Sequence, residues 1–133
     1  ICYRAPEVRD GSCSNLAAAD VFAAGIILFV LMSKQFPFGE KEDSTKMDVD
    51  CYSTFVNNNN FFWFGKISRK SKNGKKGFFT NDFMELLNGM WNVDPSSRWT
   101  LEQVKTSKWY QGEILDDITL KNQMILKFKS SNN

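Results

Sequence analysis

The sequence contains no histidine, and this absence excludes the mechanisms that depend on an imidazole. A serine–histidine catalytic pair and a histidine-ligated zinc site are therefore not available to this chain. The three cysteines, Cys2, Cys13 and Cys51, are odd in number and widely spaced, which argues against a disulfide framework or a four-thiolate metal site. We therefore expect a reducing, intracellular location, in the cytoplasm.

Long apolar runs and a strong net charge are also missing. The longest apolar run, 21–32, is shorter than the roughly 20 residues that a membrane-spanning helix needs. No charged-then-apolar segment at the start suggests export. The formal charge of +2 is too small to indicate nucleic acid by itself. We expect neither a membrane nor a nucleic acid partner.

The 133 residues suffice for one small domain with a single core, and 42% hydrophobic with 24% charged residues is typical of a soluble globular chain. The sequence opens on Ile1 rather than methionine and enters a motif within a few residues. We therefore expect it to be a piece of a longer protein.

Helical signals dominate, and we predict an all-α fold. Pro6 and Glu7 suit a first helical turn, because proline fixes its own φ and an acid favours the positive helix end. Residues 17–33 predict a helix that is apolar nearly all round and therefore buried. Gly25 inside it costs about 1 kcal/mol relative to alanine, so we expect a neighbouring backbone close to it. A shorter helix is predicted over 48–56.

The second half of the chain carries clearer helix-start signals. Thr80 is a candidate N-cap for a helix with an i, i+3, i+4, i+7 apolar stripe. The stripe is formed by Phe83, Leu86, Leu87 and Met90. A turn over 94–97 follows, and Thr100 with Gln103 predicts a capping box that opens another short helix.

Residues 57–79 form the least regular stretch, and we expect an irregular basic insertion. It holds four consecutive asparagines, an aromatic cluster, and six cations between Lys66 and Lys76 with no acid among them. Aromatic rings for base stacking and cations for phosphates would also suit single-stranded nucleic acid. A solvated loop explains the same residues better.

Residues 111–133 form a tail in which we predict one short amphipathic helix. Leu120, Met124 and Phe128 would share one helical face, and an apolar face usually marks packing against the rest of the chain. Lysines beside this face also suit the groove of a calmodulin-type protein, as an alternative.

Three short strings, in this order and spacing, resemble the second half of the large lobe of a eukaryotic protein kinase. Residues 3–7 (YRAPE) match the Ala-Pro-Glu end of the activation segment. Residues 20–29 resemble the buried helix that anchors the catalytic loop, and residues 94–98 (DPSSR) resemble the turn near the domain's end. The resemblance covers residues 1–110. It points to the serine/threonine class, with some similarity to the calmodulin-dependent group.

The resemblance implies a role for several side chains. Glu7 and Arg98 would form a buried bidentate bridge, whereas otherwise they would be two unrelated surface charges. Asp20, in an apolar neighbourhood, would accept hydrogen bonds from catalytic-loop amides, and its alternative role is a helix N-cap. Gly25 would serve helix packing. The segment that receives the protein substrate would include Ile1, Cys2, Tyr3, Ala5 and Pro6.

The chain lacks the parts that transfer phosphate: a Gly-rich loop, a strand lysine, a His-Arg-Asp loop and an Asp-Phe-Gly metal ligand. We therefore assign no catalytic, cofactor-binding or metal residue to it and expect it to be inactive alone. In the full domain the resemblance implies ATP and magnesium, a protein substrate, and an N-terminal part preceding Ile1. Two functions stay open, a fragment of an active kinase and a pseudokinase or helical protein-binding module.

Overall fold

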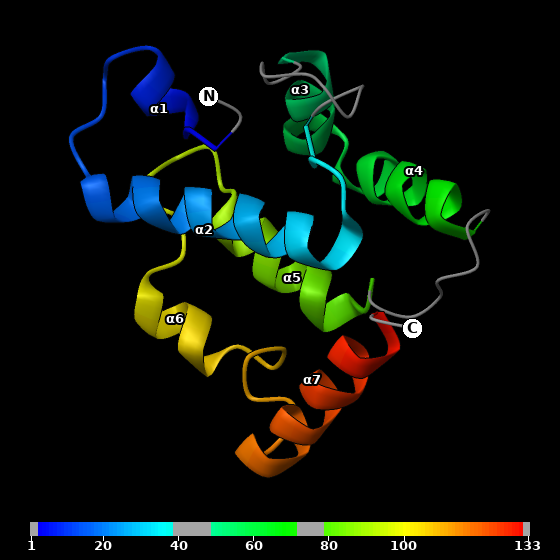
Figure 1. Cartoon of the computed structure of the whole chain (residues 1–133). Helices are drawn as coiled ribbons and strands as arrows, with labels where there is room; N and C mark the ends of the chain where they lie inside the picture. Colours follow the sequence, from blue (N-terminus) through cyan, green and yellow to red (C-terminus); the bar gives the residue numbers. More distant parts are fainter. Residues whose placement is uncertain (1–2, 39–48, 72–78, 132–133) are drawn as a thin grey trace.

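The computed structural model describes residues 3–38, 49–71 and 79–131, and all regular structure in these ranges is helical (Figure 1). The prediction of an all-α fold is therefore confirmed for the described residues. The helices are α1 (Pro6–Arg9), α2 (Leu16–Ser33), α3 (Val49–Asn57), α4 (Asn59–Ser71), α5 (Asn81–Met90), α6 (Leu101–Thr106) and α7 (Asp117–Ser131).

Helix α2 has a defined signal at each end. Asn15 is its N-cap, because the side-chain oxygen accepts a hydrogen bond from the Ala18 N–H at 3.0 Å. The helix stops where Lys34 adopts a left-handed conformation with φ 60° and donates its N–H to the Val30 carbonyl. The helix predicted over 17–33 is confirmed, with one further residue at its start.

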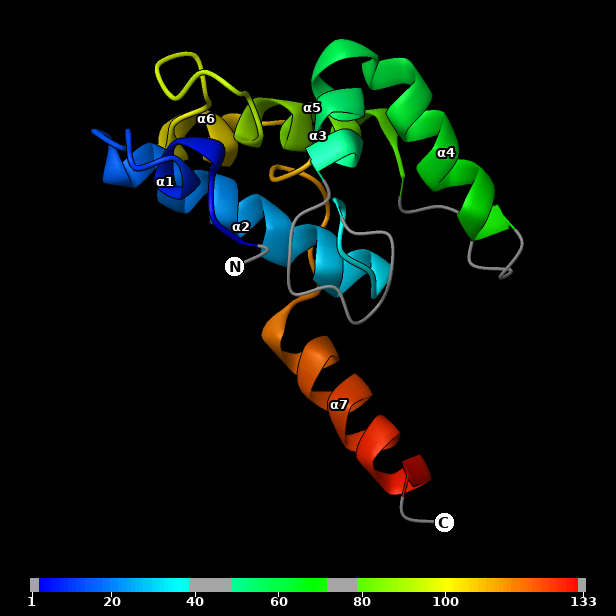
Figure 2. The same ribbon diagram turned by 90° about the horizontal axis from the view of Figure 1, so that it is seen from above.

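Helix α2 crosses α5 at the centre of the fold (Figures 1 and 2). Its buried residues are Ala18, Ala19, Phe22, Gly25, Ile26, Phe29 and Ser33. The expectation that the whole helix is buried is wrong, because Ile27 is 49% and Leu31 is 62% exposed. By length and mean hydropathy (2.3) α2 could also cross a membrane, but the core helix of a folded domain passes the same test.

Trp91, immediately after α5, is the centre of the aromatic core. Its side chain is fully buried, and its ring stacks on Trp63 with centroids 6.3 Å apart and planes 10° from parallel. Further rings lie 4.8–5.7 Å from it, those of Phe38, Phe55 and Phe29. Aromatic pairs at these separations add to the free energy of burial. This cluster ties α2, α3 and α4 to the end of α5.

Helix α4 lies where an irregular insertion was expected, so that expectation is wrong for residues 59–71. Two consecutive aromatic residues, Phe62 and Trp63, are buried against α3 and the core. Asn58 helps to begin the helix, since its side-chain oxygen accepts a hydrogen bond from the Phe61 N–H at 3.3 Å. The asparagine run therefore contains a helix start. The remaining cations at 72–76 lie outside the described residues.

The two helix starts predicted in the second half are confirmed. The Thr80 hydroxyl accepts a hydrogen bond from the Phe83 N–H at 3.2 Å. Thr100 and Gln103 form a reciprocal capping box, in which each side chain accepts from the other residue's backbone N–H.

Helix α7 extends away from the other helices (Figure 2). None of its residues is buried, and Leu126 and Phe128 are each 67% exposed. The expectation that this tail packs against the rest of the chain is therefore wrong for the described residues. At 100° per residue Leu126 lies well off the face shared by Leu120, Met124 and Phe128, so the apolar side chains do not form one stripe.

Candidate functional site

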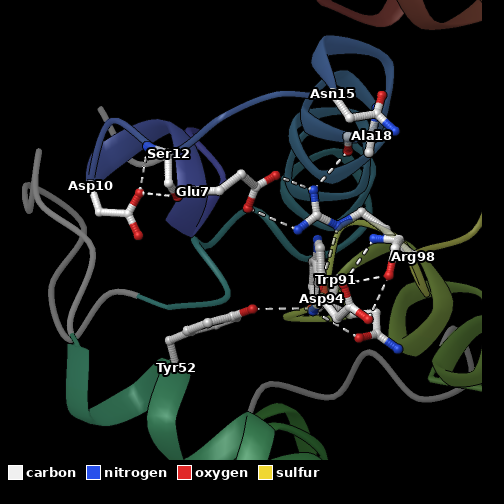
Figure 3. Close-up of polar contacts among 11 residues, drawn as sticks. Glu7, Asp10, Ser12, Asn15, Ala18, Tyr52, Trp91, Asp94 and Arg98 are labelled. Atoms are coloured by element: carbon white, nitrogen blue, oxygen red, sulfur yellow. Dashed lines mark hydrogen bonds and ion pairs between the residues drawn. The ribbon is translucent and has the colours of Figure 1, made fainter.

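The Arg98 guanidinium lies at the junction between α1, α2 and the turn that follows α5 (Figure 3). Its two terminal nitrogens donate to the two carboxylate oxygens of Glu7, at 2.6 and 3.1 Å. The exposed fractions of the two side chains are 0% for Arg98 and 9% for Glu7. The two charges that the resemblance pairs therefore form a bidentate ion pair inside the protein.

Two further donors of Arg98 are also satisfied. Nη1 donates to the Ala18 carbonyl at 2.9 Å and Nε donates to the Asn92 carbonyl at 3.0 Å. The guanidinium also lies 5.1 Å from the centre of the Phe22 ring, a cation–π distance. A buried charge with this many partners is stable only while all of them stay in place. Arg98 therefore joins α1 and the first turn of α2 to the turn that follows α5.

Asp94 builds the turn that positions Arg98. One carboxylate oxygen accepts hydrogen bonds from the Ser96 N–H and hydroxyl, and the other accepts from the Ser97 hydroxyl at 2.7 Å. These hydrogen bonds, that of the Ser96 hydroxyl first, hold the pKa of Asp94 below its usual value. The Arg98 N–H in turn donates to the Asp94 carbonyl at 2.9 Å. The predicted turn at 94–97 is thus the local support of the bridge.

Burial and hydrogen bonding act in opposite directions on Glu7. Burial raises the pKa of its carboxyl, but the hydrogen bonds from Arg98 and from its own backbone N–H, with the Arg98 charge, lower it, and the net pKa is below the usual value. Glu7 is therefore ionised at neutral pH.

Tyr52 on α3 closes the other side of this junction. Its hydroxyl donates to the Trp91 carbonyl at 3.2 Å, and burial raises the pKa of Tyr52 to about 12. Sequence reasoning missed this contact. The helical spacing around 48–56 places Tyr52 on an inward face, but nothing in the sequence identifies a carbonyl 39 residues away as the partner of its hydroxyl.

The segment expected to receive a substrate is described from Tyr3 onward, and Ile1 and Cys2 lie outside the described residues. Tyr3 is 40% exposed, and its ring meets the Phe36 ring edge-on at 5.5 Å. Ala5 is buried, so its side chain lies beneath the surface. Pro6 is the first residue of α1, where the missing N–H of proline costs nothing.

Asp20 is exposed, although an apolar neighbourhood was expected around it. Its N-cap alternative is wrong, because Asn15 caps α2 and Asp20 is the fifth residue of the helix. No hydrogen bond to its carboxylate is found among the described residues. It lies in a line of exposed residues at helical spacing along one side of α2, which we call the α2 stripe. The α2 stripe consists of Ala17, Asp20, Ala24, Ile27 and Leu31.

Gly25 faces a side chain where a backbone was expected. A Cβ at this position would lie 2.6 Å from Trp91 Nε1 and 3.2 Å from the Met90 Cβ. The glycine therefore lets the Trp91 indole lie directly against α2. The indole nitrogen is buried with no hydrogen-bond partner among the described residues.

No group of three or more His, Cys, Asp or Glu side chains that could hold a metal ion occurs among the described residues.

Comparison with known proteins supplies the family. The model of the protein kinase domain matches residues 1–110. The chain belongs to the protein kinase family. The matched range begins before the Glu7 side of the bridge and ends after the Arg98 side, so both partners lie inside the kinase domain.

Curated relatives of this kinase chain are protein kinases by name, and one of the three described here is named a serine/threonine kinase. It is 28% identical over 132 residues to the SNF-related serine/threonine-protein kinase of Homo sapiens, covering 98% of this chain and 15% of the human protein. It is 30% identical over 112 residues to CBL-interacting protein kinase 28 of Oryza sativa subsp. japonica, covering 84% of this chain and 22% of the rice protein. CBL-interacting protein kinase 19 from the same plant is 31% identical over 109 residues, covering 82% and 18%. The chain thus spans about a fifth or less of these relatives' length.

Proposed function

We propose that the chain is the C-terminal part of the large lobe of a serine/threonine kinase that transfers the γ-phosphate of ATP to a protein hydroxyl. In this proposal residues 111–133 are a tail outside the kinase domain. The chain supplies the segment that receives the protein substrate and the helical scaffold beneath it. ATP and magnesium are bound by residues that precede Ile1, within an intracellular protein that needs neither a membrane nor nucleic acid as partner.

The observation that carries this proposal is the buried bridge between Glu7 and Arg98. It fixes the end of the 3–7 segment to the turn at 94–98, although the two residues are 91 positions apart. A segment that receives a substrate must keep its geometry between turnovers, and positioning errors of about 1 Å can cost about 100-fold in rate. Tyr3, only four residues from Glu7 and packed on Phe36, is held by the same arrangement.

The α2 stripe supports the part of the proposal that makes this chain the helical scaffold of the kinase domain. Four of its five side chains are apolar, and the fifth is the carboxylate of Asp20, which has acceptor capacity to spare. A preceding segment of the kinase domain that packs on this stripe would bury apolar area and would place backbone N–H groups against Asp20. The docking segment and the catalytic loop would then be held by the two ends of one scaffold.

The test uses the protein encoded by the chain together with its upstream coding sequence. Transfer of labelled phosphate from ATP to a serine/threonine peptide library is measured for the parent and for Asp20→Asn. We expect a loss of about 100-fold in kcat, because the anchor of the catalytic loop is weakened. Asp82→Asn, at another exposed helical aspartate, is the matched control and should leave kcat unchanged.

One result would contradict the role given to Asp20, and a second would overturn the proposed kinase activity. Full phosphate transfer by Asp20→Asn would show that Asp20 anchors nothing that catalysis needs. Absence of the metal-binding aspartate from the upstream sequence, with no transfer by the parent, would establish the protein-binding module instead.

A further inference from the structure

A groove of about 550 Å³ lies between α4 and α5, away from the Arg98 bridge. One wall is formed by the α4 side chains Phe64 and Ile67, and the facing wall includes Met84 of α5. Phe64 is 68% and Ile67 is 42% exposed, so the apolar wall is open to solvent. Among the described residues that line the groove, Glu85 is the one charged side chain. Such a lining disfavours a strongly anionic partner, nucleic acid included.

The polar part of the groove is an asparagine pair whose orientation is fixed by its neighbours. Asn88 Oδ1 accepts hydrogen bonds from Trp63 Nε1 and from Asn59 Nδ2, each at 3.0 Å. Because an indole nitrogen only donates, the atom that it meets must be the oxygen of Asn88. Asn59 Nδ2 also donates to the Phe55 carbonyl at 3.3 Å, which fixes the second amide in the same way.

This arrangement leaves one donor and one acceptor available. Neither the Asn88 Nδ2 group nor the Asn59 Oδ1 atom has a hydrogen-bond partner within the described part of the chain. Neither is a buried polar atom without a partner, so both are open to solvent or to the groove. The two amides are in direct contact, and both line the groove. A peptide backbone presents one C=O and one N–H per residue, which is what this pair can bind.

We propose that the α4–α5 groove binds an extended peptide segment that carries a large apolar side chain. Asn88 Nδ2 donates to a backbone carbonyl of the peptide, and Asn59 Oδ1 accepts from a backbone N–H. The apolar side chain covers Phe64, Ile67 and Met84, and Glu85 favours a lysine or arginine beside it. The pair needs no reorganisation, since Trp63 and Phe55 already hold both amides in place, and preorganisation lowers the cost of binding. This binding does not depend on phosphate transfer.

The chain offers two matched pairs of variants. Asn88→Asp keeps the oxygen that accepts hydrogen bonds from Trp63 and Asn59 but replaces the free donor by an acceptor. Asn122→Asp makes the same change on the exposed helix α7. Phe64→Ala removes the exposed wall, and Phe61→Ala removes a ring of similar exposure (64%) that does not line the groove.

The experiment pans a phage library of random dodecamers against the immobilised chain and measures the affinity of the enriched peptides by fluorescence anisotropy. We expect peptides that share an aromatic or large aliphatic residue. Their affinity should fall about tenfold or more for Asn88→Asp and for Phe64→Ala, and should stay within about twofold for the two controls. In ¹⁵N-resolved NMR spectra the peptide should shift the indole N–H of Trp63 and the side-chain amide of Asn88. Each variant must keep the helical circular dichroism of the parent. If Asn88→Asp loses it, the comparison of Phe64→Ala with Phe61→Ala decides the test.

Three outcomes would overturn the proposal. The first is no enrichment of any peptide. The second is equal loss of affinity for Phe61→Ala and Phe64→Ala, which would indicate unspecific adhesion to exposed rings. The third is a dimer of the chain that Phe64→Ala abolishes while no peptide binds, because the occupant would then be a second copy.

Discussion

The two longest helices of the described chain, α2 and α7, differ both in composition and in burial. Fifteen of the 18 residues of α2 are apolar, against six of the 15 residues of α7, and α2 buries seven residues whereas α7 buries none, not even its apolar ones. Their partners also differ, since α2 crosses α5 and meets Trp91, whereas α7 extends away from the other helices (Figure 2). An apolar pattern therefore indicates which face can be buried, and only a complementary neighbour decides whether it is.

Removal of the Arg98 side chain, which donates to the Ala18 carbonyl at the start of the buried helix α2, should give the largest loss of stability. Arg98→Ala leaves the Glu7 carboxylate buried without its partner, and removal of one member of a buried pair costs about 3–5 kcal/mol in the free energy of unfolding. Urea unfolding followed by circular dichroism measures it. Lys105→Ala is the control, because the Lys105–Glu102 pair is exposed, at 3.5 Å, and worth less than about 1 kcal/mol. Equal losses for the two variants would contradict the assigned role of the bridge.

Disturbing the close contact between α2 and Trp91 should give the next largest loss of stability. Gly25→Ala places a Cβ against the indole and should destabilise the fold by about 1–3 kcal/mol through overpacking. Gly65→Ala, in α4, meets no atom within 4 Å and should stabilise by about 0.5–1 kcal/mol, since alanine is the better helix former. Opposite shifts of the melting temperature are the expected readout, and shifts of the same sign would contradict the packing at Gly25.

Acid should weaken the bridge in a defined direction. The pKa of Glu7 is lower in the folded chain than the ordinary value of 4.5, so the ionised carboxylate stabilises the fold above that pH. This stabilisation is lost as the pH falls from 4.5 through the folded pKa, where the unfolded chain binds the proton first. Glu7→Gln should therefore unfold with a shallower pH dependence than the parent in this window. Identical acid transitions of the two proteins would show that Glu7 does not contribute to it.

The smallest change in the free energy of unfolding is expected for a substitution on α7. Phe128→Ser removes a ring that is 67% exposed, and such surface changes usually stay within about 0.5 kcal/mol. Phe29→Ala, in the buried face of α2, should cost about 3–5 kcal/mol by the same measurement. A loss of more than 1 kcal/mol for Phe128→Ser would reveal a packing partner for α7 and would remove the contrast with α2.

Local signals in the sequence predicted much of the fold. The caps at Thr80 and Thr100 involve neighbours three residues away, so the sequence contains all that is needed to recognise them. The 94–97 turn is of the same kind. The pairing of Glu7 with Arg98 came from a resemblance to protein kinases, because no local rule connects residues 91 positions apart.

The errors occurred where burial by a distant segment decides the outcome. Four asparagines and a basic run indicated a loop at 57–79, yet Phe62 and Trp63 pack into the core and hold α4 in helical form. The Leu120 face of α7 indicated packing that the described residues do not provide. The asparagine pair of the α4–α5 groove could not be predicted either, since it depends on an indole 25 residues from Asn88.

The separation of Glu7 from Arg98 also bears on the order in which the chain folds. The α3–α4 pair joins near neighbours in sequence, and short loops close at little entropic cost. The bridge closes a loop of 91 residues, so it cannot form until the ribosome has released nearly the whole scaffold. During synthesis the Glu7 carboxylate therefore stays hydrated until the guanidinium of Arg98, 91 positions later, has been made. Contacts of such long range slow folding, and the 3–7 segment should reach its native position after the α3–α4 pair has formed.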